Sequence, residues 1–178
     1  QLCACIISIR KLDEVSLKVA LNFFSKIKRV QDLARLSEEQ IFELIRPSAF
    51  ARQKAKNLKA IAEVALERHR GNIPCDYDEL TYLPGVGPKY ANLVLGIACG
   101  TPAIGVDIHV HRITNRWGFI RAANPEKSML QLSERLDQKY WLQLNELLVP
   151  FGKHICTGKL PKCSTCPVRD YFQQVGVT

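Results

Sequence analysis

The chain has 178 residues, a formal net charge of +8 at neutral pH and a pI of about 9.2. This length suffices for one domain or two small lobes, and the excess of Lys and Arg favours a polyanionic partner, although a merely basic protein would carry the same charge. The sequence has no run of about eighteen apolar residues, which excludes a membrane-spanning helix. Seven cysteines in an otherwise ordinary composition argue against a secreted disulfide scaffold.

The hydrophobic pattern is helical from the start of the chain. Residues 1–7 predict a buried helix rather than a signal peptide, because they lack a basic lead and a cleavage site. An amphipathic run follows Asp13. Ser37 then begins a capping box, with Gln40 reaching back, for a helix that ends near Pro47.

A longer helix is expected from about residue 52 to residue 69, with its apolar side chains on one face. Its basic side chains are expected to form a solvated face: Lys54, Lys56, Lys59 and Arg68. Residue Asp76 caps a short helix that leads to a glycine turn. The next helix is expected at residues 89–98 and is terminated by Gly100.

Three more helices are expected beyond Pro102, at residues 107–119, 125–136 and 140–149, followed by a loop rich in cysteine. No segment has the alternation of apolar and polar residues that is typical of a half-buried strand. The sequence therefore predicts an all-α fold.

The glycine turn consists of Gly85, Val86 and Gly87, and Lys89 follows it in the first turn of the expected helix. Two glycines at this spacing let backbone N–H groups face an anion, and a helix N-terminus adds positive potential, so the turn suits a phosphate. The same potential favours the neutral, nucleophilic form of a lysine amine. A lone aspartate, Asp107, stands beyond the helix.

The string Leu-Pro-Gly-Val-Gly-x-Lys-x-Ala-Asn at residues 83–92, with Val-Asp-x-His-x-x-Arg-x-x-Asn-Arg at residues 106–116, resembles the helix–hairpin–helix plus Gly/Pro-Asp signature of base-excision DNA glycosylases. The resemblance is closest to the endonuclease III family and extends from Ile6 to Pro167. It implies two helical lobes with a cleft between them: a six-helix lobe with the hairpin at residues 1–101, and a second lobe with the cysteine loop at residues 102–178. The helix that the family usually has upstream is expected to be missing from this chain.

The resemblance implies a catalytic pair. Lys89 would attack C1′ of the sugar and form a Schiff base, and Asp107 would stabilise the developing positive charge or remove a proton. Two plainer interpretations stay open at these positions, namely a surface lysine that contacts phosphate and an aspartate that only caps a helix. The resemblance also implies that Gly85, Val86 and Gly87 bind the DNA backbone without reading its sequence.

Further DNA contacts are implied at four positions. Arg10 lies in the segment that fills the void left by a flipped base, where the endonuclease III family commonly has glutamine. Phe50 aligns with the wedge loop that intercalates near the unpaired partner base, although a core position is the alternative. Lys159 and Lys162 would contact phosphate from the cysteine loop.

Three cysteines match the first three ligands of the family's four-cysteine iron–sulfur loop: Cys156, Cys163 and Cys166. Phe172 stands where the fourth ligand of the 4Fe–4S cluster is required. Three interpretations stay open. An iron–sulfur cluster is retained with a substitute ligand such as Asp170 or as a three-iron remnant, zinc is bound by the three cysteines and His154, or the loop is free of metal and packed by Phe172.

The resemblance therefore implies a bifunctional DNA glycosylase and AP lyase of base excision repair, which flips out oxidised pyrimidines and cuts 3′ to the abasic site. One alternative is a glycosylase for mispaired A or T, against which Lys89 argues. Another is a DNA-binding relic without activity, which the missing fourth cysteine favours and the retained Lys89 and Asp107 disfavour. The expected partner is double-stranded DNA with a damaged base or an abasic site, and we expect an intracellular monomer without membrane contact.

Overall fold

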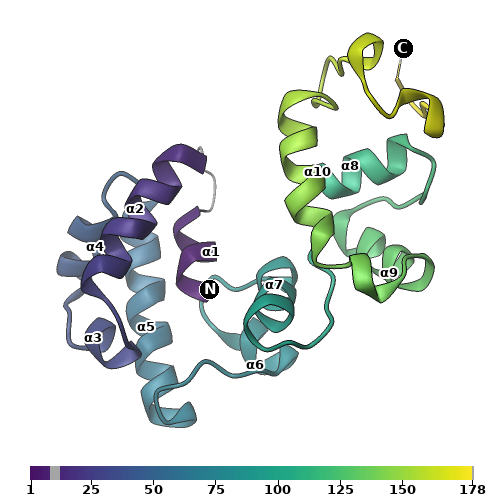
Figure 1. Cartoon of the computed structure of the whole chain (residues 1–178). Coiled ribbons are helices and arrows are strands. Elements are labelled where there is room, and N and C mark those ends of the chain that lie inside the picture. The colour runs from purple at the N-terminus through teal and green to yellow at the C-terminus, as the bar shows by residue number, and fades with distance from the viewer. Residues whose placement is uncertain (9–12, 178) are drawn as a thin grey trace. The chain divides into compact units, whose positions relative to one another are not determined.

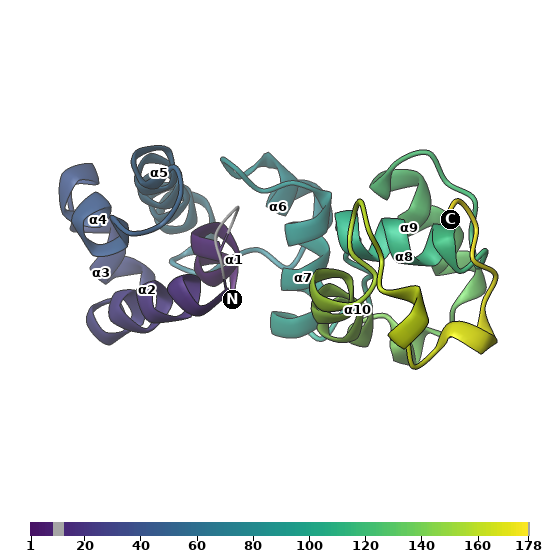
Figure 2. The ribbon, with the colours of Figure 1, turned by 90° about the horizontal axis from the view of Figure 1, so that it is seen from above.

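The structure is a computed structural model that describes residues 1–8 and 13–177, and these residues form helices and connecting loops without a β-strand. The predicted all-α class is confirmed. The chain divides into two compact units, Gln1–Val94 and Leu95–Thr178, each of which is described by itself. Figure 1 labels the helices of both units, and Figure 2 shows the same ribbon from above.

Unit 1 contains the helices that precede the boundary. They are α1 (Leu2–Ser8), α2 (Asp13–Lys26), α3 (Val30–Ala34), α4 (Glu38–Ile45), α5 (Ala51–His69), α6 (Tyr77–Tyr82) and the first part of α7 (Pro88–Ala98). Helix α5 is the centre of this unit, because α1, α3 and α4 all pack against it. The short helix α3 has no counterpart among the elements that the sequence predicts.

Local signals in the sequence set the ends of several helices in unit 1. Ser37 caps α4 as predicted: its hydroxyl accepts a hydrogen bond from Gln40 N at 3.2 Å, and Gln40 Oε1 accepts one from Ser37 N at 2.9 Å. Asp76 caps α6 through a 3.0 Å hydrogen bond from Glu79 N. These caps satisfy backbone N–H groups that have no partner inside the helix.

The prediction of a fully solvated basic face on α5 is wrong at two positions: Lys59 is half-buried and its Nζ donates to the carbonyl of Ala34, and Lys54 is buried. This side chain is only 3% exposed, and its Nζ donates a 2.8 Å hydrogen bond to the carbonyl of Ile7 at the end of α1. A buried ammonium needs such an acceptor, because leaving it without one costs several kcal/mol, of order 3–5. Lys54 therefore ties the C-terminal end of α1 to α5.

Unit 2 is built around α8. Its elements are the end of α7, α8 (Ile108–Arg116), α9 (Pro125–Arg135), the 3₁₀ turn η1 (Gln138–Tyr140), α10 (Gln143–His154) and the 3₁₀ turns η2 (Cys163–Thr165) and η3 (Arg169–Tyr171). Helix α8 packs against both α9 and α10. The core of this unit is aliphatic and consists of Ile104, Val106, Val110, Ile113, Ile120, Leu132 and Leu148.

The last long helix departs from its predicted limits. Residues 140–149 were expected to be helical, whereas α10 begins at Gln143 and continues through Pro150 to His154. Packing of α10 against α8 accounts for the extension, since burial of an apolar face outweighs the hydrogen bond that a proline removes. Across the residues that the structure describes, no helix combines the length and the apolar character needed to cross a membrane.

Candidate functional site

The predicted glycine turn connects α6 to α7 in unit 1. Val86 N donates a 3.1 Å hydrogen bond to the carbonyl of Leu83, which closes the turn, and the Val86 side chain is buried. The carbonyl of Gly87 accepts hydrogen bonds from Tyr90 N and Ala91 N, both at 3.0 Å, and so starts α7. With its valine side chain anchored in the core, the turn offers a partner mainly its backbone.

Glycine is required at only one of the two glycine positions in the turn. Gly85 has a φ of +78°, which L-residues rarely adopt, and a Cβ at this position would lie 2.3 Å from Nδ2 of Asn57 on α5. A Cβ on Gly87 would meet no atom within 4 Å. Asn57 therefore backs the turn, and nothing in the sequence pattern pointed to this residue.

Lys89 lies in the first turn of α7, directly behind the glycine turn, and its side chain is half-buried. Its Nζ lies 5.6 Å from the centre of the Tyr90 ring. Burial raises the pKa of the Cys5 thiol on α1, and the positive charge of Lys89 opposes this rise.

Asp107 caps α8 in unit 2. Its Oδ1 accepts hydrogen bonds from His109 N and Val110 N, each at 2.9 Å, and the side chain is half-buried. These bonds fix the carboxylate at the N-terminus of the helix, where the helix dipole favours a negative charge. The capping interpretation is therefore correct, and it is compatible with a catalytic role because a cap holds the carboxylate in one position.

Arg112 connects α8 to the end of α10 and to the start of the cysteine loop. Its Nη2 donates hydrogen bonds to the carbonyls of Gly152 and Cys156, both at 2.9 Å, and also lies 3.1 Å from Nδ1 of His109. Burial lowers the pKa of His109, which favours the neutral ring, the form that can accept from the guanidinium. Gly152 makes room for this arrangement, since a Cβ there would lie 2.7 Å from Nδ1 of His109.

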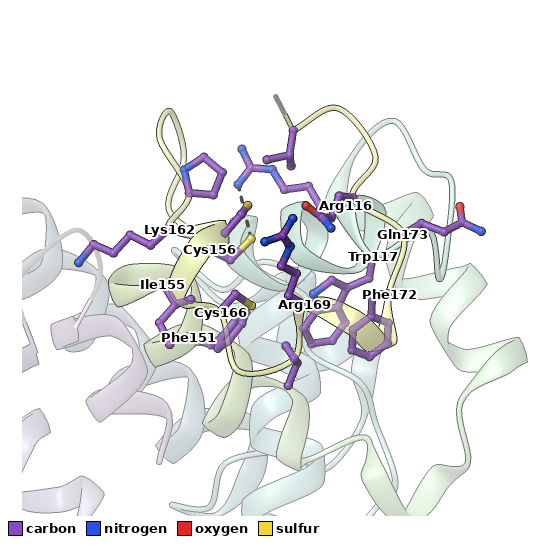
Figure 3. Close-up of a pocket in the computed structure, with 15 residues that line it drawn as sticks. Arg116, Trp117, Phe151, Ile155, Cys156, Lys162, Cys166, Arg169, Phe172 and Gln173 are labelled. Carbon is purple, nitrogen blue, oxygen red and sulfur yellow. Dashed lines mark hydrogen bonds between the residues drawn. The ribbon is translucent and has the colours of Figure 1, made fainter.

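Arg116, one helical turn further along α8, holds the next part of the loop. Its guanidinium donates to the carbonyl of Thr157 through Nη1 and to that of Gly158 through Nη2, the latter at 2.6 Å. Nη1 also lies 3.5 Å from Sγ of Cys156, as the dashed line in Figure 3 marks. The motif at residues 106–116 contains both arginines, but the spacing alone gave no sign of their role in the loop.

The three cysteines of the loop line one pocket of about 40 Å³, drawn in Figure 3. Across residues 1–8 and 13–177, no group of three or more His, Cys, Asp or Glu side chains is placed so that it could hold a metal ion. Phe172 lines the same pocket, and its ring stacks on that of Trp117 with 4.1 Å between centroids and 7° between planes. His154 and Asp170, the substitute ligands considered from the sequence, are exposed.

The residues expected to contact DNA fall in different parts of the chain. Arg10 lies outside the described residues. Phe50 is 63% exposed and precedes α5 with a φ of +56°, so the alternative of a core position is wrong. Lys159 and Lys162 are exposed on the cysteine loop. Unit 1 thus carries Phe50, the glycine turn and Lys89, whereas unit 2 carries Asp107 and the loop.

Comparisons with known proteins agree with this geometry. The family profile described as "HhH-GPD superfamily base excision DNA repair protein" matches residues 3–138. Endonuclease III of Thermotoga maritima is 35% identical over 172 residues, which cover 97% of this chain and 81% of that protein. A non-covalent endonuclease III–DNA complex matches with a TM-score of 0.88 and 31% identity over 97% of this chain and 81% of the other. A trapped covalent endonuclease III–DNA intermediate matches with a TM-score of 0.86 and 32% identity, and the match covers 93% of this chain and 78% of the other.

Proposed function

Because this chain belongs to the HhH-GPD superfamily of base excision DNA repair proteins, we propose that it removes damaged pyrimidines from double-stranded DNA with Lys89 and Asp107 as its catalytic pair. The membership and the endonuclease III relatives bear out the enzyme class that the sequence predicts, a DNA glycosylase with AP lyase activity. The observation that carries the assignment of the nucleophile is the place of Lys89, in the first turn of α7 and directly behind the glycine turn.

Base removal begins with attack on the sugar. The target nucleotide must leave the duplex, because its C1′ atom cannot be reached in the stack. Lys89 Nζ forms a bond to C1′ as the glycosidic bond breaks, and the base leaves with the bonding electrons and takes up a proton. Asp107 stabilises the positive charge that develops on the sugar, or accepts the proton that the amine loses.

Strand cleavage follows from the same covalent intermediate. Opening of the sugar ring converts the C1′–N bond into a protonated Schiff base, which acidifies the C2′ proton. Loss of that proton expels the 3′ phosphate by β-elimination, and water then releases Lys89. A glycosylase that used only a carboxylate and water would release the base without this cut, so a lysine at position 89 favours the bifunctional reaction.

The backbone of the glycine turn would grip a phosphate near the flipped nucleotide. Exposed Phe50 would fill space next to the partner base, and Lys159 and Lys162 would contact phosphates from the loop. Support for these roles comes from their exposure and from the net charge of +8. We propose that the protein acts as a monomer inside the cell, in the compartment that contains its DNA substrate.

The family commonly binds a 4Fe–4S cluster, and such a cluster takes four thiolates. This chain offers three cysteines in the loop, while the position of the fourth holds a phenyl ring that lies flat on Trp117 and has no atom that can bind iron. The residues present therefore do not fit a cluster with four protein thiolates. No step of the reaction above depends on a metal.

The test is a panel of duplexes, incubated with the protein with and without borohydride. The panel contains thymine glycol, an abasic site, and A or T in a mispair. We expect base release and strand cleavage on the first duplex, strand cleavage on the second, and borohydride trapping on both. Release of mispaired A or T without trapping would point to a mismatch glycosylase, and binding without any product would point to a DNA-binding relic.

A further inference from the structure

The position of the missing fourth thiolate is filled by an aromatic contact. Phe172 stacks on Trp117 at 4.1 Å with nearly parallel rings, and Trp117 in turn contacts Phe151 on α10 at 5.9 Å. Aromatic pairs of this kind stabilise a structure beyond the apolar area that they bury. The stack thereby attaches the end of the loop to the core of unit 2.

The beginning of the loop is held by cations of α8. Arg112 and Arg116 together donate five hydrogen bonds to main-chain carbonyls of residues 152–158. Hydrogen bonds from a charged donor are stronger than those between neutral groups, and two planar guanidinium groups fix the direction of the accepting carbonyls. The beginning of the loop is therefore attached to α8, and its end is attached to Trp117, the C-cap residue of α8.

We infer that the cysteine loop, residues 156–172, keeps its fold without a metal centre. The Trp117–Phe172 stack together with Arg112 and Arg116 holds the loop in place, as an iron–sulfur cluster with four thiolates would. The inference comes from the mismatch between a four-thiolate centre and the residues present. The three remaining cysteines then behave as thiols packed around a small pocket, with the sulfur of Cys156 next to Arg116.

Phe172 acts here as a positioning residue for the two exposed lysines of the loop. This part rests on the proposed function, because it takes Lys159 and Lys162 as phosphate contacts. If the stack fixes the loop, the lysines are held in place for DNA before binding, and less ordering entropy is lost when DNA binds.

The first experiment measures metal in the intact protein. The chain is produced in medium supplemented with iron and zinc and purified without oxygen, and its metal content and thermal unfolding are measured with and without a chelator. We expect well below one atom of iron or zinc per chain and a Tm that the chelator does not change. One or more metal atoms per chain, removed by the chelator with a fall in Tm, overturn the inference.

The second experiment tests the stack. Phe172→Ala should lower the Tm by about 3–8 °C and increase protease cleavage in the loop. Phe172→Tyr keeps the ring and should have the Tm and the cleavage rate of the unaltered protein. Tyr171→Ala is the matched control, since this neighbouring ring is 80% exposed. An unchanged Tm in Phe172→Ala, or equal losses in Phe172→Ala and Tyr171→Ala, contradicts the role of the stack. If the unaltered protein gives no borohydride-trapped product, the proposed function fails. That result is distinguishable from a failure of the inference about the loop, which is read from Tm and protease cleavage.

Discussion

The glycine turn at residues 85–87 and the cysteine loop at residues 156–172 are both irregular segments that we expect to contact DNA, but different kinds of contact hold their backbones. In the turn, a positive φ at Gly85 and a hydrogen bond from Val86 N to Leu83 fix the backbone locally. In the loop, the contacts come from Arg112 and Arg116 of α8 and from Trp117, the C-cap residue of α8. Each lies at least 41 residues before its partner in the loop.

This difference decides which residues of each segment can be replaced while the segment keeps its fold. A turn made by local backbone conformation depends on residue types at a few adjacent positions, so it can be recognised from the sequence alone. A loop held by distant side chains can replace one attachment with another, as Phe172 stands where a fourth thiolate is expected. The four predictions that follow test this contrast, beginning with the largest expected effect.

Replacing Lys89 with Gln should abolish borohydride trapping on abasic DNA and leave DNA binding in place, because the amide cannot form a Schiff base. Lys56→Gln, an exposed lysine on α5, is the control and should trap normally. Trapping yield on a denaturing gel measures the effect. A trapped product in Lys89→Gln would place the nucleophile away from the glycine turn and refute the proposed role.

Replacing Asp107 with Asn should slow base release by roughly two orders of magnitude, because the amide cannot stabilise a cationic sugar or accept a proton. The helix cap should survive, since an Asn side chain is also a good N-cap. Single-turnover release of thymine glycol measures the rate. Asp170→Asn is a matched change of an exposed carboxylate in the loop. Equal rates for Asp107→Asn and the unaltered protein would reduce Asp107 to a cap.

Replacing Gly85 with Ala should destabilise unit 1 and weaken DNA binding. The φ of +78° costs an L-residue about 1–2 kcal/mol, and the new Cβ would also displace Asn57. Gly87→Ala is the matched control for stability, because a Cβ there meets no atom within 4 Å. Chemical denaturation gives the comparison. If both variants lose equal stability, local strain at Gly85 does not hold the turn.

Neutralising Lys159 or Lys162 should have the smallest effect. Each change to Gln should reduce the slope of log affinity against log salt by about 0.9, because one fewer counterion is released from the DNA. Lys56→Gln, an exposed cation on α5, serves as the control. Titrations at several salt concentrations measure the slope. Slopes that stay constant in both loop variants would show that the loop does not touch phosphate.

Single residues show where prediction from the sequence succeeds. Ser37 and Asp76 are helix caps as predicted, because a cap is decided by groups three residues apart. Lys54 shows where it fails: its spacing on α5 resembles that of its exposed neighbours, and only the arrival of α1 at its side turns it into a buried donor. Burial is a property of contacts between distant segments, which helical periodicity does not report.

The sequence by itself determined the helical class, the family and the glycine turn, since each depends on residue types at fixed short spacings. It also predicts Lys89 and Asp107 as a catalytic pair, and that role stays a prediction. Only the tertiary structure decided that Asn57 backs the turn, that Arg112 and Arg116 hold the cysteine loop, and that Phe172 stacks on Trp117. Such contacts depend on the directions in which side chains leave separate helices, and folding fixes those directions through packing of the whole unit.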